Sequence, residues 1–105
     1  MKRRKSEISV PAGSQVGIAW FTCEQWQRLT EIADDRNELD ETFERWERNA
    51  LSALYTLHSK GHSVRKVMVD VDTFVAWCRG RRRRADAAAR ADYVIALLKL
   101  ADDSA

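Results

Sequence analysis

The first clear pattern of apolar positions along the chain covers residues 15–21, where a nearly unbroken apolar run ends in two aromatic residues. Such a run is typical of a strand that is covered on both faces by helices. The turn-forming residues Pro11, Gly13 and Ser14 come just before it and predict that the strand begins near residue 15. The short apolar segment 8–10 is a candidate arm that would pair with this strand.

A first helix is predicted to begin at Thr22. Thr22 and Gln25 have the spacing of a capping box, in which the Thr22 hydroxyl accepts from a backbone amide and the Gln25 side chain reaches back. Trp26, Leu29 and Ala33 then fall on one side of the helix. The polar cluster at residues 34–37 is expected to end it.

The most regular helical pattern begins at Leu39 and predicts a helix over residues 41–59 that is capped by Asp40. Lys60 and Gly61 supply a cationic last turn and a left-handed stop. Trp46 lies in the middle of the stripe, so we expect it to be buried in the core. The apolar stripe consists of Leu39, Phe43, Trp46, Ala50, Ala53, Leu54 and Leu57.

Residues 64–71 are rich in β-branched side chains and predict the second strand. Asp72 is expected to end this strand and to cap a short helix that carries Phe74, Trp77 and Cys78. Gly80 is expected to break that helix, and a run of arginines follows it.

The last helix is predicted over residues 86–100, and more than half of its circumference is apolar. A second apolar stripe lies beside the one that would face the core, which predicts a dimer face at Tyr93, Leu97 and Leu100. The expected core stripe consists of Ala87, Ala91, Val94, Ile95, Leu98 and Ala101.

These elements predict a mostly helical α+β fold in the order β-α-α-β-α-α. Two strands that are joined through helices most naturally lie parallel, with a right-handed crossover. A two-stranded sheet is marginal in water, so a second subunit is expected to cover or extend it. We expect a basic, mobile tail and turn at residues 1–14, one globular domain at 15–101 and a disordered end at 102–105.

The chain has 105 residues, of which 45% are hydrophobic, as expected for one domain with a real core. Its basic start is not followed by the apolar stretch of a signal peptide, and there is no apolar run of membrane-spanning length. Two cysteines, Cys23 and Cys78, are too few for a disulfide framework and are expected to be reduced and buried. A cytoplasmic protein without a membrane partner is therefore expected.

The net charge is only +2, but the charges are unevenly distributed. Five arginines are concentrated within six residues, where their guanidinium groups could bind the phosphates of a nucleic acid or another polyanion together with the basic tail. The alternative is a solvated loop between helices, and no aromatic residue interrupts the run to stack on bases. The candidate phosphate contacts are Arg79, Arg81, Arg82, Arg83 and Arg84.

The segment 31–48 has the opposite character, with eight acidic residues against three arginines. This asymmetry suggests charge complementarity with a polyanion or with another copy of the chain. In the second case, the acidic segment would face basic residues of a neighbouring subunit.

Residues that could carry chemistry have simpler explanations. His58 and His62 have a spacing that can suit zinc, but the two cysteines lie too far apart in the sequence to complete a zinc finger. Asp70 and Asp72 could hold Mg²⁺ at a strand end, although helix capping explains Asp72 better. We therefore predict no catalytic residue, metal or cofactor, and a protein that is not an enzyme.

The order of several segments resembles small uncharacterised bacterial proteins of domain size. The segments are residues 19–22, Trp26 with Leu29, 34–35, 42–46, 69–72, Phe74 with 77–78, and 89–91 with Tyr93. The resemblance spans about residues 16–95 and implies a bacterial origin without any catalytic residues. The basic tail and the arginine run are not part of this pattern.

Two functions follow as expectations. The first is a non-enzymatic interaction or accessory domain that acts as a homodimer or binds another protein. The alternative is nucleic-acid or polyanion binding through the arginine run and the basic tail.

Overall fold

The computed structural model describes residues 15–104, with side chains described as far as Ala101. The expected pairing of residues 8–10, and the predicted basic tail and turn, lie outside the described residues. In chain order the elements are β1 (Gln15–Trp20), α1 (Cys23–Ile32), the short 3₁₀ helix η2 (Arg36–Glu38), α2 (Phe43–Ser59), β2 (Ser63–Met68), α3 (Val71–Gly80) and α4 (Ala87–Ser104). The predicted α+β fold and its β-α-α-β-α-α order are confirmed.

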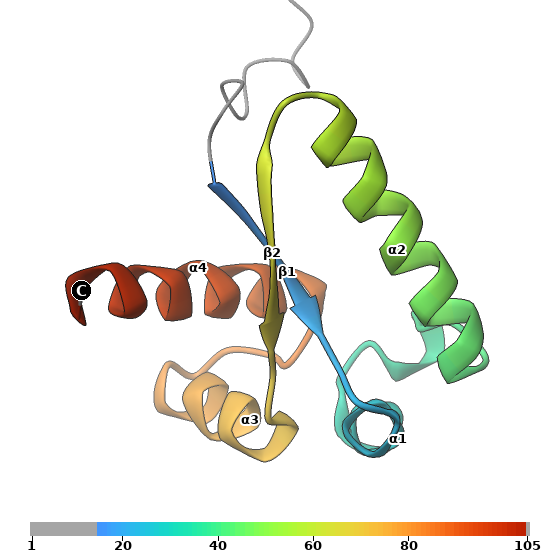
Figure 1. Cartoon of the computed structure of the whole chain (residues 1–105). Coiled ribbons are helices and arrows are strands. Elements are labelled where there is room, and N and C mark those ends of the chain that lie inside the picture. The colour runs from blue at the N-terminus through green and yellow to red at the C-terminus, as the bar shows by residue number, and fades with distance from the viewer. Residues whose placement is uncertain (1–14, 105) are drawn as a thin grey trace, which may run out of the picture.

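The two strands form a parallel sheet, as predicted, with Gln15 opposite Ser63 and Trp20 opposite Met68. Helix α4 crosses one face of this sheet, whereas α2 lies along the other side (Figure 1). Helices α1 and α3 lie beyond the carboxyl ends of the strands.

The sheet approaches α4 closely because Gly17 has no side chain. A Cβ atom at this position would lie 2.6 Å from Leu98 Cδ1, 2.7 Å from Val94 Cγ1 and 3.2 Å from Val67 Cγ2. Glycine therefore permits the backbone of β1 to contact the α4 side chains directly.

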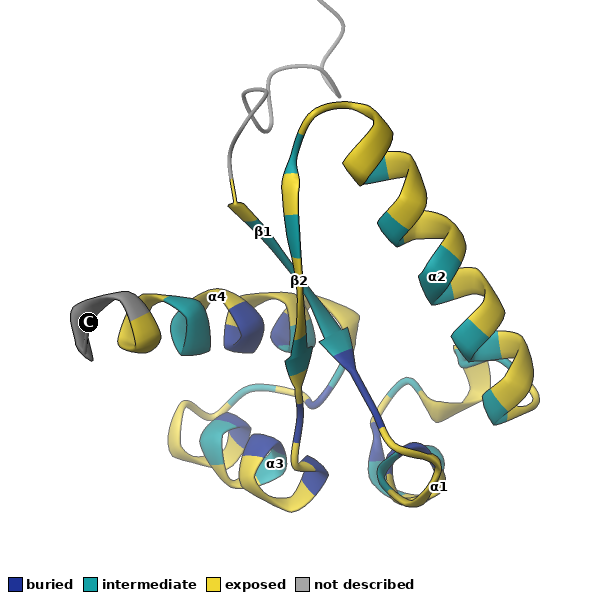
Figure 2. Ribbon diagram, viewed as in Figure 1, coloured by how far each residue is buried: buried dark blue, intermediate teal, exposed yellow. Residues whose placement is uncertain are grey.

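The buried core lies at the carboxyl ends of the strands, among α1, α3 and α4 (Figure 2). Side chains that are far apart in the sequence meet here, and apolar burial of this kind is the main stabilising term of a small domain. The fully buried large side chains are Leu29, Val71, Phe74 and Cys78.

The start of α1 confirms half of the predicted capping box. Thr22 Oγ1 accepts from the Gln25 amide at 3.1 Å, but the Gln25 side chain does not return to Thr22. Its Oε1 accepts instead from the Val71 amide at 2.6 Å and so satisfies the first amide of α3. A residue of α1 thus supplies a cap for a helix that is 46 positions later in the chain.

The start of α2 corrects a second cap. Thr42, not Asp40, is the N-cap, and its Oγ1 accepts from the Arg45 amide at 3.1 Å. Asp40 accepts from the Asn49 side chain at 3.2 Å. At the other end, Gly61 has a φ of 91°, which confirms the predicted left-handed stop.

The end of β2 and the start of α3 differ from prediction by a few residues. The strand ends at Met68, and α3 begins at Val71, so the N-cap position belongs to Asp70 and Asp72 lies in the first helical turn. Gly80 is the last residue of α3 rather than its breaker. The left-handed turn falls on Arg82, whose φ is 53°.

The predicted phase of α4 is wrong for most of its core stripe. Ala87, Ala91 and Ala101 are exposed and Ile95 is 62% exposed, whereas Ala89 and Tyr93 are buried together with Val94. The reason is that α4 packs against α3 as well as the sheet, with the Tyr93 ring centroid 5.4 Å from that of Phe74. The helix also continues to Ser104, past its predicted end and through residues that we expected to be disordered.

Helix α2 differs from the other α-helices in having no buried residue. Most of its apolar stripe is only half-buried, and Ala53 is exposed. Trp46, which we expected in the core, is half-buried and packs at the edge of it. Figure 2 shows α2 without any buried position along its length.

Candidate functional site

The arginine run forms a compact turn that follows α3. The backbone amides of Arg81 and Arg83 both donate to the Cys78 carbonyl at 3.0 Å, and the amide of Arg82 donates to the Arg79 carbonyl at 3.1 Å. These bonds satisfy the carbonyls of Cys78 and Arg79 in the last turn of α3.

Two of these arginines lie over an aromatic ring that the sequence pattern did not connect with them. The guanidinium carbon of Arg81 lies 4.3 Å from the ring centroid of Trp77, and that of Arg83 lies 5.7 Å from it. A shallow hollow of about 360 Å³ beside them is lined by Trp77, Arg81, Ala96, Lys99 and Leu100. The spacing of four residues between Trp77 and Arg81 was a signal for this contact, because residues four apart lie on the same side of a helix.

The arginines differ in how far they are engaged within the chain. Arg83 forms an ion pair with Asp92 at 2.9 Å, and Arg84 donates to the Asp34 carbonyl at 3.5 Å. Within residues 15–101, the side chains of Arg79 and Arg82 make no hydrogen bond or ion pair, and both residues are exposed. The predicted phosphate contacts therefore divide into engaged and unengaged groups.

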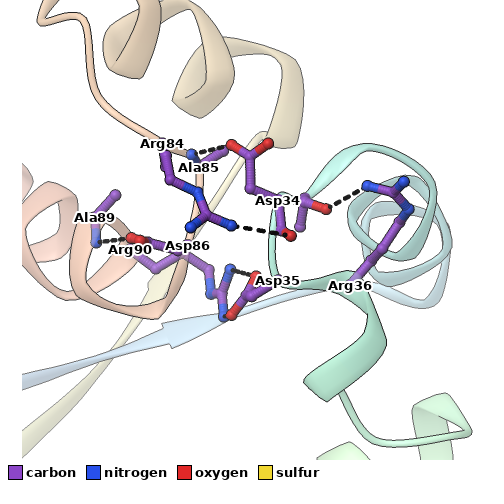
Figure 3. Close-up of polar contacts among 9 residues, drawn as sticks. Asp34, Asp35, Arg36, Arg84, Ala85, Asp86, Ala89 and Arg90 are labelled. Carbon is purple, nitrogen blue, oxygen red and sulfur yellow. Dashed lines mark hydrogen bonds and ion pairs between the residues drawn. The ribbon is translucent and has the colours of Figure 1, made fainter.

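The acidic segment after α1 meets the α3–α4 connection of its own chain (Figure 3). Asp34 Oδ2 accepts from the Ala85 amide at 2.6 Å, and the Asp34 amide donates to the Ala85 carbonyl at 2.9 Å. Asp35 accepts both guanidinium hydrogen bonds of Arg90. Part of the predicted charge complementarity is thus satisfied within one chain rather than across subunits.

The Asp35–Arg90 pair is the least exposed ion pair among the described residues. Its side chains are 13% and 11% exposed, and its two N–O distances are 2.9 and 2.7 Å. Hydrogen bonding to Arg90 lowers the pKa of Asp35 below its usual value, against the opposing effect of burial. Such a two-bond pair fixes the relative orientation of the segments that carry it.

The residues considered for metal binding do not come together. Among residues 15–101, no group of three or more His, Cys, Asp or Glu side chains could hold a metal ion. His58 is exposed near the end of α2, and His62 is half-buried with an Nδ1 atom that lacks a hydrogen-bond partner. Asp72 binds Arg28 at 3.1 Å, and Asp70 accepts from the Thr73 hydroxyl at 3.0 Å.

The two cysteines lie in different environments. Cys78 is buried as predicted, and burial raises the pKa of its thiol, which disfavours the reactive thiolate. Cys23 is exposed, contrary to prediction, and it is the first residue of α1. It borders an open hollow of about 550 Å³ between α1 and the start of α2.

The predicted dimer face on α4 is only partly accessible. Tyr93 is 6% exposed and belongs to the core of its own chain, because its ring packs between Phe74 and Trp77. Leu97 packs against that core, and Leu100 is 62% exposed. These three residues therefore do not form one accessible face.

A partly covered apolar surface lies on the α2 side of the sheet. Alternation along the strands places Val16, Ile18 and Trp20 on the same side as Val64, Lys66 and Met68, and Trp20 contacts Trp46 of α2 at 5.2 Å between ring centroids. On this side Met68 is 56% exposed. Tyr55, nine positions after Trp46 and so on the opposite side of α2, is 66% exposed. The sequence stripe predicted a covered helix and so did not reveal this surface.

Comparison with known protein families, curated proteins and solved structures gives no match to this chain. The resemblance to small bacterial proteins therefore stays a prediction. Across the described residues, none of the helices is both long and apolar enough to span a membrane.

Proposed function

We propose that this chain is a non-enzymatic interaction domain that acts as a homo-oligomer. The observation that carries the proposal is the half-buried apolar stripe of α2, a 17-residue helix without one buried residue. An amphipathic helix derives most of its stability from covering its apolar face. In α2 the chain itself provides only part of that cover.

The sheet supports the same conclusion. One face is packed closely against α4 through Gly17, whereas Val16, Ile18 and Val64 on the α2 side are half-buried and Met68 is mostly exposed. Exposed apolar patches of this kind mark interaction sites on small domains. A second copy is the partner that is always present with the protein.

The non-enzymatic part of the proposal is supported by the environments of the candidate side chains. Asp70 and Asp72 are engaged in local hydrogen bonds, and the buried Cys78 has a raised thiol pKa. We also propose a bacterial, cytoplasmic protein from the sequence resemblance. The two unpaired cysteines are compatible with a reducing compartment.

Sedimentation at micromolar concentration tests this proposal. We expect a dimer or larger species, and Leu54→Glu should convert it to a monomer because a buried unpaired charge opposes association. Ala88→Glu, at an exposed position on α4, is the matched control and should leave the association unchanged. A wild-type species of 12.1 kDa across the concentration range would refute the proposal.

A second function, polyanion binding, is favoured by the state of the arginine turn. Arg79 and Arg82 are exposed and unengaged, and Arg81 lies beside Lys99 along one hollow. The guanidinium group of Arg81 lies over the face of the Trp77 indole, so this face is not open to stack on a base. The turn is therefore better suited to contacts with phosphates than to base stacking. The ligand proposed for this turn is therefore duplex nucleic acid bound through its backbone.

The salt dependence of binding to a duplex DNA oligonucleotide tests this second function. Arg79→Ala with Arg82→Ala should weaken binding and reduce the slope of log affinity against log salt by about one to two. Arg45→Ala with Arg48→Ala removes the same charge from α2 and is the matched control. No binding at low salt, or an equal loss in both double variants, would contradict a specific role for the turn.

A further inference from the structure

We propose that the partner of α2 is α2 of a second copy, lying antiparallel across a two-fold axis next to Leu51. This inference rests on the proposed self-association and adds the surface and its geometry. The inference rests on a row of residues on α2 that lies next to the side of the helix packed against its own chain.

A row of residues follows one side of α2 with alternating spacings of three and four. Residues at these spacings form one continuous side of a helix and are the positions that meet in paired helices. Two of them, Leu51 and Leu54, are half-buried leucines in the middle of the row. The row consists of Glu44, Glu47, Leu51, Leu54 and His58, and Tyr55 lies next to it.

Apart from Leu54, which also belongs to the apolar stripe, this row is distinct from the residues by which α2 is held to its own chain. Trp46 contacts Trp20, Phe21 and Trp26 by its ring, and Phe43 packs beside it. Leu51 and Tyr55 lie farther round the helix, and Tyr55 is 66% exposed. The row can therefore meet a partner without removing α2 from the fold.

The two ends of the row are equidistant from Leu51. Glu44 precedes Leu51 by seven residues and His58 follows it by seven, which is two helical turns or about 10 Å in each direction. In an antiparallel pair, Leu51 meets Leu51 of the partner, and Glu44 comes opposite the partner's His58. A two-fold interface requires such self-complementarity, since each contact occurs twice.

The charges along α2 favour the antiparallel orientation over the parallel one. Acidic residues gather at its start, where Asp40, Glu41, Glu44 and Glu47 lie, and the side chains at its end are His58 and Lys60. The arginines near its start, Arg45 and Arg48, are exposed, and Arg45 is bound by Glu41 at 3.6 Å. An antiparallel pair brings the acidic start over the basic end twice, whereas a parallel pair would place Glu44 against Glu44.

Cysteine cross-linking tests this geometry in the full-length chain. The exposed Cys23 is first replaced by Ser, which leaves the buried Cys78. A cysteine at a residue on the two-fold axis lies close enough to its own copy to form a disulfide, which requires Cα atoms less than about 7 Å apart. Mild oxidation of Leu51→Cys should therefore convert most chains to a covalent dimer. Ser52→Cys, one residue away on the outer side of α2, is the matched control and should stay uncross-linked.

Mixing two cysteine variants distinguishes an antiparallel from a parallel pair of helices. The cysteines are placed at two exposed positions, where substitution should leave the fold intact. Glu44→Cys mixed with His58→Cys should give a disulfide between the two variants, and neither variant should cross-link with itself. Self cross-linking of Glu44→Cys would show a parallel pair and would overturn the inference. A dimer in sedimentation that lacks both the Leu51→Cys and the mixed cross-link would overturn the inference and leave self-association standing. A monomer in sedimentation would refute the proposed function itself.

Discussion

Arg90 and Asp35 are 55 positions apart in the sequence and are joined by two parallel hydrogen bonds in a largely buried pair. The pair connects α4 to the turn that follows α1, next to the contact between Asp34 and Ala85 (Figure 3). It holds the start of α4 against the turn after α1.

Arg90→Ala should lower the free energy of unfolding by about 3–5 kcal/mol, because it leaves the Asp35 carboxylate buried without its partner. Denaturant unfolding measures this loss. Arg83→Ala breaks the more exposed pair with Asp92 and should cost no more than about 1 kcal/mol. Equal losses in the two variants would show that the buried pair has no special role.

Stability should fall in acid because of Asp35. Its pKa is lowered in the folded chain, mainly by hydrogen bonding to Arg90, so the carboxylate binds protons more weakly there than in the unfolded chain. The stabilisation is complete above the unfolded pKa of about 3.9 and is lost as the pH falls through the lower, folded value. Urea midpoints between pH 6 and pH 2 should show this decline, and Asp35→Asn should flatten it. An unchanged pH dependence in Asp35→Asn would assign the decline to other carboxylates.

Two glycines should respond to alanine with opposite signs. Gly17→Ala places a methyl group against Leu98 and Val94 and should destabilise the chain by about 1–3 kcal/mol. Gly80→Ala meets nothing within 4 Å at the end of α3 and should stabilise it by up to about 1 kcal/mol. Thermal unfolding of both variants measures the difference. A neutral Gly17→Ala would mean that β1 and α4 can separate without cost.

Trp46 should be important for stability although it is only half-buried. Its ring lies within 5.2–5.6 Å of four other aromatic rings, between centroids, and stacks on Trp26. Trp46→Ala should therefore cost about 3 kcal/mol, the lower end of the range for large aromatic residues. Tyr55→Ala, at a residue that is 66% exposed on the same helix, is the control and should change monomer stability by less than about 0.5 kcal/mol. Similar losses in both would contradict the packing around Trp46.

The order and type of the elements could be predicted because their signals are local. Apolar runs gave the strands their positions, the Thr22 hydroxyl marks the start of α1, and Gly61 has the left-handed φ that ends α2. The choice between Asp40 and Thr42 as a cap could not be made locally, because both residue types are good caps. The phase of α4 was also ambiguous, since apolar residues surround most of that helix.

The contacts that define the candidate surfaces were not predictable, because they join distant segments. Gln25 binds Val71, Asp34 binds Ala85 in the α3–α4 connection, and Asp35 binds Arg90 in α4, across 46 to 55 residues of chain. The position of Arg81 over Trp77 depends on how the turn after α3 closes. The exposure of α2 arises because a sheet of only two strands covers little of this 17-residue helix.

The parallel register has a consequence for how the chain acquires its structure during synthesis. Among the described residues, each paired position in β1 finds its partner in β2, which follows only after α1 and α2, so this pairing cannot form as a local hairpin. Such non-local pairing has a high contact order and slows folding. On the ribosome, β1 must therefore wait for this pairing until β2 emerges. Fragments that end before Ser63 should aggregate or require a chaperone.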